Sequence, residues 1–233
     1  DASIDICPVC GVGREHFVPV EMKVSGFSNN TQEYYVILGN GAAGYYAAKA
    51  IRERDKTGTI VMISNEPYLS YNRPMLTKSI VAGLSAEQIA IADKTWYEKQ
   101  NIFPMLSKEV VDVDTEQKEV VLEDKSRVHY TKLIYALGSE CFVPPIKGST
   151  LPEVAVIRRL ADVERVEVLI REAKSAVVIG GGVLGLESAW ELRKAGLSVT
   201  VLEVAPVLMG RQLDIDAGEW LLQAAKKSGI EVR

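Results

Sequence analysis

The sequence is poor in cysteine and has no long hydrophobic run. Three cysteines occur among 233 residues, too few for the disulfide framework that stabilises many small secreted domains. No apolar stretch approaches the roughly 18 residues needed to cross a bilayer, and the N-terminus lacks the charged and then apolar pattern of a signal peptide. We therefore expect a cytoplasmic protein whose cysteines are thiols or metal ligands.

The sequence also lacks any concentration of charge of one sign. Its formal net charge is -4, and basic and acidic residues are interleaved along the chain. This pattern offers neither a basic stripe for nucleic acid nor a polybasic membrane anchor. With 47% hydrophobic residues, the chain can form one large or two ordinary domains. Because it begins without Met and ends on "GIEVR", we expect a fragment or a processed product of a longer protein.

A first glycine-rich turn follows a strand-like run and precedes a helical pattern, in the order "YYVIL", "GNGAAG", "YYAAKAIRERD". Gly39 would permit the tight turn, and Gly41 would let the backbone approach a pyrophosphate. Gly44 would let the helix pack closely against the strand. Ala42 and Ala43 would open this helix, whose N-terminal N–H groups favour phosphate.

A carboxylate completes this first pattern. Glu66 ends the next strand, "TIVMISNE", and is placed to accept hydrogen bonds from ribose hydroxyls. The alternative for the glycines alone is a chance glycine-rich turn. The strand, the helix and the acid together favour a dinucleotide site.

The same order of strand, glycine turn, helix and strand appears again in "SAVVIGGGVLGLESAWELRKAGLSVTVLE". Gly180, Gly182 and Gly185 take the three glycine positions, and Val183 and Leu184 would open the helix. A simple dehydrogenase needs one such unit. Two units therefore imply two nucleotides, FAD and NADH.

The acid of the second unit predicts which nicotinamide cofactor is preferred. Glu203 closes the second strand, where a carboxylate pairs with a free 2'-hydroxyl and repels a 2'-phosphate. The next residue is Val204 and not an arginine, so NADH is favoured over NADPH. Arg211 lies further along the chain and leaves NADPH as the alternative.

From about residue 33 to its end, the chain resembles the FAD- and NAD-dependent pyridine nucleotide-disulfide oxidoreductase superfamily, in particular the NADH-dependent reductases of rubredoxin, ferredoxin or nitrite reductase. The motifs are "VILGNGAAGYYAAKAIRERD", "EPYLSYNRPMLTK", "LIYALGS" and "VVIGGGVLGLESA". The resemblance implies an α/β fold with two Rossmann-like domains, similar to glutathione reductase. Residues 33–150 would bind FAD, and residues 151–233, an incomplete domain, would bind NADH.

The resemblance also implies roles for individual residues. Arg73 and Pro74 would lie against FAD, and Lys78 would reach the edge of the flavin ring as a catalytic residue. A cation there stabilises the reduced, anionic flavin. The alternative for Lys78 is a solvated helix lysine. Glu187 would be the acid near the nicotinamide, with a partly buried helix residue as its alternative.

Two departures from the superfamily pattern affect the expected site. The motif that usually reads Ala-Thr-Gly is Ala136, Leu137 and Gly138 here, so a hydroxyl is lost while the cofactor-binding turn is expected to persist. Residues 65–80 contain no cysteine, so the redox-active pair of the disulfide reductases is missing. Electrons would leave the flavin without a protein disulfide, and Cys141 is expected to be a small, partly buried residue.

The N-terminal stretch "CPVCGVGREHF" resembles the C-terminal half of rubredoxin. Cys7 and Cys10 would supply two of the four thiolates of a closed iron or zinc site, so iron is expected when a second cysteine pair is supplied. We assign residues 1–24 to this half site and residues 25–32 to a linker. A half zinc knuckle completed by another chain and a vestige without metal are the alternatives.

The resemblance implies a flavoprotein oxidoreductase that passes electrons from NADH through FAD to a rubredoxin-type iron or another one-electron acceptor. Its partner would be rubredoxin or another small electron carrier, and a homodimer is compatible with this superfamily. The NADH-oxidising portion of a nitrite reductase or an NADH oxidase is the alternative among enzymes. A nucleotide-binding fragment without turnover is the alternative outside them.

Overall fold

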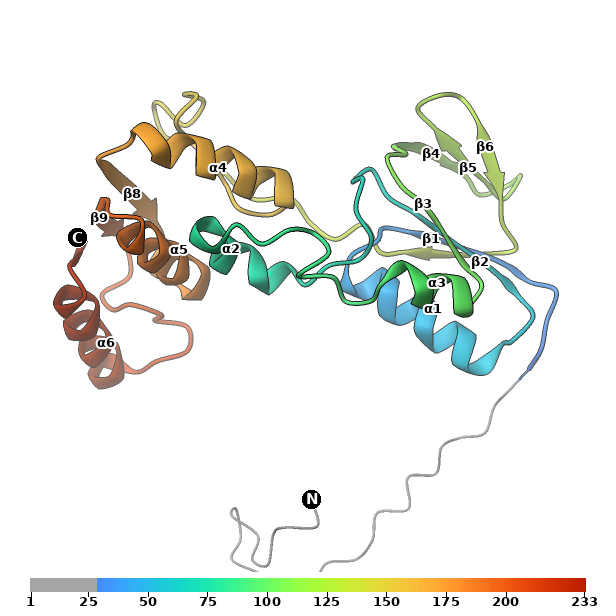
Figure 1. Ribbon diagram of the computed structural model, residues 1–233, viewed down its shortest axis with the longest axis horizontal. Helices are drawn as coiled ribbons and strands as arrows, with labels where there is room; N and C mark the ends of the chain where they lie inside the picture. Colours follow the sequence, from blue (N-terminus) through green and yellow to red (C-terminus); the bar gives the residue numbers. More distant parts are fainter. Residues whose placement is uncertain (1–28) are drawn as a thin grey trace, which may run out of the picture.

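The computed structural model describes residues 29–233, which form two lobes joined by a narrower waist (Figure 1). Cys7, Cys10 and residues 25–28 of the predicted linker lie outside the described residues. The first lobe holds a four-stranded sheet and a three-stranded meander, and the second holds a three-stranded sheet. None of the helices within residues 29–233 is long and apolar enough to span a bilayer.

The first lobe is built on a parallel sheet in the order β3-β2-β1-β7. Its strands are β1 (Tyr34–Leu38), β2 (Thr59–Ile63), β3 (Ile102–Met105) and β7 (Lys132–Tyr135). The chain runs outward from β1 to β2 and β3, and then returns to the other side of β1 with β7. The point where the strand order reverses therefore lies at β1, which is where ligands bind in open α/β sheets.

Both faces of this sheet are covered, which explains why β1 and β2 read as nearly continuous apolar runs. On one face, Val36 and Ile63 pack against Val120 of the antiparallel meander. The meander consists of β4 (Val110–Asp114), β5 (Glu119–Leu122) and β6 (Arg127–His129). On the other face, Ile37 and Met62 pack with the helices α1 (Ala42–Arg54) and α3 (Lys94–Lys99).

A segment of the first half of the chain packs into the second lobe. After β2, the chain forms the short 3-10 helix η2 (Arg73–Met75) and α2 (Leu76–Ala82). Leu76 and Ile80 of α2 belong to the core of the second lobe, with Val163 and Ala189. The helix α2, although it comes from the first half of the chain, therefore lies in the second lobe and contacts the helices there (Figure 1).

The second lobe repeats the same unit in a smaller form. Its parallel sheet has the order β10-β9-β8, formed by β8 (Ser175–Ile179), β9 (Ser198–Leu202) and β10 (Ile230–Val232). The helices α5 (Val183–Lys194) and α6 (Ile215–Lys227) contact the sheet, and α4 (Leu160–Glu172) packs on α2. The other face of β8 is open, because Val177 and Ile179 are about three-fifths exposed.

The predicted fold class is confirmed: both glycine turns follow the first strand of a parallel α/β unit and open a helix. The short β-branched runs "EVVDVD", "KEVVLED" and "KLIYALG" predict a small meander that ends in a return strand, and these are present as β4 to β6 and β7. The sequence analysis did not predict α3, β3 or α4. The elements α3 and β3 are short, whereas the helical spacing of Leu160, Val163 and Val166 could have indicated α4.

Candidate functional site

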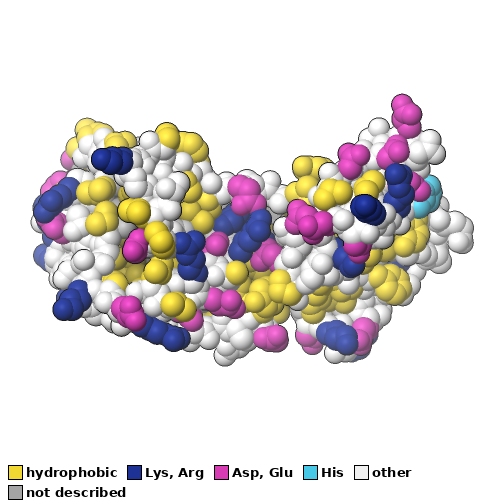
Figure 2. Space-filling view, turned by 90° about the horizontal axis from the view of Figure 1, so that it is seen from above, with side chains coloured by type: hydrophobic (Ala, Val, Ile, Leu, Met, Phe, Trp, Pro, Cys, Tyr) yellow, Lys and Arg dark blue, Asp and Glu magenta, His cyan; other side chains and the backbone are white. Residues whose placement is uncertain are grey.

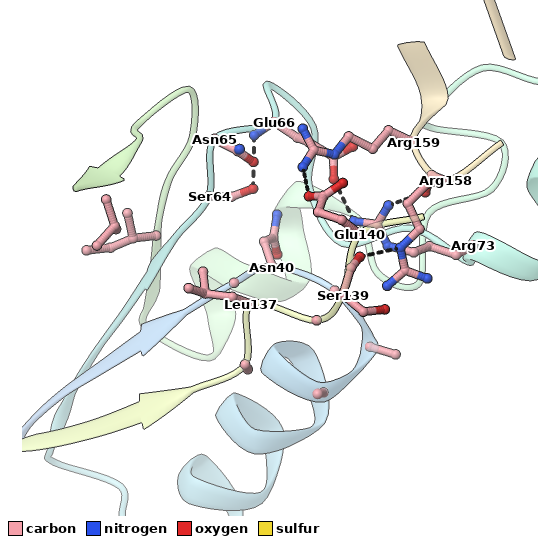
Figure 3. A pocket seen from close by; sticks show the side chains of 18 of the residues that line it. Asn40, Ser64, Asn65, Glu66, Arg73, Leu137, Ser139, Glu140, Arg158 and Arg159 are labelled. Carbon is pink, nitrogen blue, oxygen red and sulfur yellow. Dashed lines mark hydrogen bonds and ion pairs between the residues drawn. The ribbon is translucent and has the colours of Figure 1, made fainter. Parts of the chain in front are cut away.

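A cavity of about 450 Å³ lies at the carboxyl ends of β1, β2 and β7 in the first lobe (Figure 3). It is lined by the glycine turn after β1, by the ends of the other two strands, and by residues that precede α4. The lining residues are Gly39, Asn40, Gly41, Ala42, Ala43, Ile63, Ser64, Asn65, Glu66, Arg73, Lys108, Glu109, Val110, Ala136, Leu137, Gly138, Ser139, Glu140, Arg158 and Arg159.

The first glycine turn has the geometry that its predicted role requires. Gly39 has φ of +107°, and a Cβ there would overlap the carbonyl oxygen of Ala136 in the neighbouring strand. A Cβ on Gly44 would overlap the carbonyl oxygen of Gly39, so only glycine lets the helix lie this close. Ala42 and Ala43 begin α1 beside the cavity, where the N–H groups of the first turn have no intrahelical partner.

Glu66 lies in the cavity wall and is held by two residues of its own chain. The Tyr71 hydroxyl donates to Oε2 at 2.6 Å, and Arg73 Nη2 donates to Oε1 at 2.5 Å. Burial, and then the bond to Glu66, raise the pKa of Tyr71 above its usual value, so this phenol stays protonated. The carboxylate is thereby oriented, and it retains acceptor capacity for a ribose hydroxyl.

Arg158 and Arg159 bring positive charge to the cavity from the second half of the chain (Figure 3). Arg158 Nε donates to the Ser139 carbonyl at 2.9 Å, and Arg159 pairs with Glu140. Their sequence neighbourhood carried no recognised motif, so sequence reasoning missed both. Figure 2 shows basic and acidic side chains together in the concave waist between the lobes.

The turn after β7 forms the wall of the cavity next to the glycine turn. Ala136 N donates to the Leu38 carbonyl at 2.8 Å, which extends the sheet by one residue toward the glycine turn. Gly138 has φ of +77°, as the predicted turn requires. Leu137 lines the cavity and is half exposed, so an apolar side chain stands where the superfamily usually has a hydroxyl.

The second glycine turn repeats the backbone of the first. Gly180 has φ of +106°, and a Cβ on Gly185 would overlap the Gly180 carbonyl oxygen. Gly182 is the N-cap of α5, and Val183 and Leu184 begin this helix with exposed side chains. All five predicted positions therefore lie around one helix N-terminus, which favours an anionic group.

Glu203 lies beside this second turn, as the sequence predicted. Its Oε2 accepts from Gly181 N at 2.6 Å, and its Oε1 accepts from Ala205 N at 2.8 Å. These backbone hydrogen bonds lower the pKa of Glu203 below its usual value, and the bond from Ala205 has the largest effect. The carboxylate is therefore ionised at neutral pH and fixed at the turn, where it would meet the ribose of a bound nucleotide.

Lys78 and Glu187 meet where α2 packs on α5. Lys78 Nζ lies 3.0 Å from Glu187 Oε1, and the Thr77 hydroxyl donates to Oε2 at 2.6 Å. These two hydrogen bonds lower the pKa of Glu187, and the bond from Thr77 has the largest effect. Both charged side chains remain partly exposed. The two predicted catalytic residues thus form one pair within the second lobe, and the Pro74 carbonyl accepts a longer hydrogen bond from Lys78 at 3.3 Å.

No group of three or more metal-ligating side chains occurs within residues 29–233. Cys141 is exposed, not partly buried as its size suggested. The predicted metal ligands Cys7 and Cys10 lie outside the described residues.

The residues of the first lobe fit an FAD-sized ligand. Gly39 and Gly41 leave backbone at the cavity without side chains, and Glu66, Arg158 and Arg159 are the lining residues that would hold a ribose and phosphates. A second cavity of about 520 Å³ shares Ala42 and Arg73 with the first and has Pro74 in its wall. Space for a long ligand therefore continues from the glycine turn toward η2, in the direction of α2.

Comparison with known proteins agrees with this arrangement. Residues 34–233 match the family described as pyridine nucleotide-disulphide oxidoreductase. The ferredoxin–NAD(+) reductase subunit of the benzene 1,2-dioxygenase system of Pseudomonas putida is 34% identical over 199 residues, which are 85% of this chain and 48% of that protein. The NAD(P)H nitrite reductase of Bacillus subtilis is 37% identical over 196 residues, which are 84% of this chain and 24% of that protein.

Solved structures give the same result. NADH:rubredoxin oxidoreductase from Clostridium acetobutylicum superposes with a TM-score of 0.74 and 32% identity, covering 87% of this chain and 52% of that one. A ferredoxin reductase from Rhodopseudomonas palustris has a TM-score of 0.81 and 28% identity, covering 86% and 50%. The chain thus spans about half the length of these structures. Because the family match covers most of its residues, the chain belongs to the pyridine nucleotide-disulphide oxidoreductase family.

Proposed function

We propose that the chain is the nucleotide-binding part of an NADH-dependent reductase that carries FAD in its first lobe and NADH in its second. The observation that supports this most is the presence of two glycine turns, each opening a helix and each accompanied by an ordered acid, Glu66 or Glu203. When bound, FAD would supply a ring that accepts two electrons as hydride and releases them singly.

In this proposal the charged pair on α2 and α5 stabilises charge on the flavin. The Lys78 ammonium stabilises negative charge that develops on the flavin ring, as a fixed cation does in a site shielded from water. Glu187 holds this ammonium in place, and Thr77, which is buried, holds Glu187. Lys78 and Glu187 therefore act as a pair across the contact of α2 with α5.

The electron acceptor in this proposal is a small one-electron carrier of the rubredoxin or ferredoxin type. Two relatives support it by name, the rubredoxin oxidoreductase of C. acetobutylicum and the ferredoxin reductase subunit of P. putida. The second candidate is the NADH-oxidising part of a nitrite reductase, which the 37% identity to the B. subtilis enzyme favours. Reduction of purified carriers and of nitrite, compared at equal flavin content, distinguishes the two.

A direct test is the anaerobic addition of NADH to the chain loaded with FAD. We expect the visible flavin absorption to bleach, and we expect loading with FMN to fail because FMN lacks the adenosine that the glycine turn and Glu66 address. A chain that binds no flavin, or that prefers FMN, would overturn the proposal.

The variant Lys78→Ala tests the role of the ammonium. It is expected to keep FAD bound and to lower the flavin reduction potential by about 30 mV, equivalent to a tenfold change in a two-electron equilibrium. Lys94→Ala is the matched control, because Lys94 makes an exposed pair with Glu98 on α3. An unchanged potential in Lys78→Ala would identify the lysine as a surface residue.

For Cys7 and Cys10 we propose one half of a rubredoxin-type iron site, which a second cysteine pair completes. A longer chain that includes a second pair is expected to bind one iron, and Cys10→Ser should abolish its thiolate-to-iron absorption. Flavin reduction by NADH should persist in that variant, since a linker joins the two centres. Loss of both signals together would contradict an electron-acceptor role for this segment.

A further inference from the structure

Asn40, between the first two glycines of the first turn, has a buried polar side chain that the proposed chemistry does not use. Asn40 is 8% exposed although it lines the cavity. Its Nδ2 donates to the Tyr68 carbonyl at 2.8 Å, and its Oδ1 accepts from the Ser70 hydroxyl. Turning the amide over would set two oxygens against each other at Tyr68, so the hydrogen bonds fix its orientation.

The hydrogen bonds continue from Asn40 into the core. The Tyr97 hydroxyl of α3 donates to Ser70 Oγ at 2.8 Å and accepts from Ser70 N at 3.3 Å. Ser70 and Tyr97 are both almost fully buried. A buried chain of this kind is rigid, because each lost partner leaves a polar group without water to replace it.

These bonds connect two parts of the candidate FAD site. Asn40 belongs to the turn whose N–H groups would meet the pyrophosphate, and Tyr68 and Ser70 begin the segment that leads to Arg73 and Pro74. The two parts lie on different segments of the chain. The hydrogen bonds of the Asn40 side chain therefore fix the distance between the glycine turn and the segment that leads to Arg73.

We propose that Asn40 is a positioning residue for FAD: its side chain ties the glycine turn to residues 68–70 and so fixes the turn relative to Arg73 and Pro74. The inference rests on the proposed binding of FAD in the first lobe. It concerns affinity for the whole ligand, since a ligand that reaches both parts gains from their fixed separation while a shorter one does not.

The second glycine turn shows that the position itself does not require a polar side chain. Gly181 takes the place of Asn40, and a Cβ there would lie 2.5 Å from a methyl group of Leu208. The turn is instead held by Glu203, which accepts from Gly181 N. In the first lobe Glu66 bonds to Tyr71 and Arg73 and not to the turn. Asn40 therefore fixes the first turn, as Glu203 fixes the second.

The test is titration of the flavin-free full chain with FAD and with ADP, the latter a probe that spans the glycine turn but not η2. Asn40→Ala is expected to weaken FAD binding about tenfold or more, as the loss of one or two buried hydrogen bonds allows, and ADP binding clearly less. Ser70→Ala and Tyr97→Phe should weaken FAD binding by about threefold, because each removes one link further from the turn.

The control is Tyr35→Phe, which also removes a hydroxyl from the first lobe. Tyr35 donates to Asp55 at 3.1 Å at the opposite end of β1. It should bind FAD like the wild type, and it should lower the melting temperature of the flavin-free chain less than Tyr97→Phe, because Tyr35 makes one part-buried bond while Tyr97 makes two bonds to the fully buried Ser70. Equal FAD affinity in Tyr35→Phe and Tyr97→Phe, or equal losses for FAD and ADP in Asn40→Ala, would overturn the inference. A wild-type chain that binds no FAD would instead overturn the proposed function.

Discussion

The two glycine turns share their backbone conformation and differ in what surrounds them. Gly39 and Gly180 have φ angles of +107° and +106°. The strand before Gly39 lies inside its sheet, with β7 beside it, whereas within residues 29–233 the strand before Gly180 lies at the edge of its sheet. One sequence pattern therefore specifies the turn, while the neighbouring strand decides how tightly the turn is confined.

The strands before the turns differ in the same way. Val36 of β1 is completely buried, because the meander covers its face of the sheet. Val177 holds the same place in β8, three residues before its glycine, and is 62% exposed. The first lobe thus has a two-sided core, and the second lobe has a core on the face of α5 and α6.

The largest difference is expected on adding a methyl group to each turn. Gly39→Ala should destabilise the chain by about 3 kcal/mol or more, since it combines backbone strain at positive φ with overlap on the Ala136 carbonyl. Gly180→Ala should cost about 1 kcal/mol, from strain alone, because within residues 29–233 no heavy atom beyond its two chain neighbours lies within 4 Å of its added Cβ. Urea unfolding of both variants measures the difference, and equal losses would contradict it.

The second difference concerns the strands. Val36→Ala removes two methyl groups from a fully packed core and should cost about 2 kcal/mol. Val177→Ala should change the free energy of unfolding by less than about 0.5 kcal/mol, because its side chain is already in water. A large loss in Val177→Ala, measured by the same urea method, would show that another part of the protein covers this face.

The local parts of the fold could be predicted from the sequence because strand, turn and helix signals are short-range. The glycines at 39, 44, 180 and 185, and the acids Glu66 and Glu203, lie where the patterns predict them. These positions depend on alternation, turn conformation and close packing, all of which are properties of residues near each other in the chain.

The contacts that assemble the site could not be predicted in this way, because they join distant segments. Arg158 is held at the cavity by its hydrogen bond to the carbonyl of Ser139, which lies 19 residues earlier in the chain. The helix α2 packs into the core of the second lobe, far from it in sequence. Asn40 occupies a position for which the glycine motif specifies no residue type. Its importance depends on Ser70 and Tyr97, which no spacing rule connects to it.

The third difference concerns the two acids. Glu203→Ala should reduce the preference for NADH over NADPH about tenfold, since a carboxylate at this turn repels a 2'-phosphate. Glu66→Gln should leave that preference unchanged and weaken FAD binding instead, because Glu66 lies in the other lobe. Initial rates with both nicotinamide cofactors measure the effect. A wild-type chain that prefers NADPH would contradict the assignment of Glu203.

The smallest effect is expected at the contact of α2 with α5 in the second lobe. The folded-state pKa of Glu187 is lowered, so its bonds to Thr77 and Lys78 stabilise the fold above the pKa of the unfolded chain and are lost as pH falls through the folded pKa. Because this carboxylate is partly exposed, solvent screens the contribution, which should stay below about 1 kcal/mol.

Glu187→Gln removes the titrating group and keeps its size. The wild type should therefore be more stable than this variant at pH 7. The two free energies of unfolding should begin to converge below pH about 4, where the unfolded carboxylate becomes protonated, and should meet once the pH has fallen through the folded-state pKa. A difference that stays constant from pH 7 to acid would contradict this prediction, because it would show that ionisation of Glu187 does not stabilise the contact of α2 with α5.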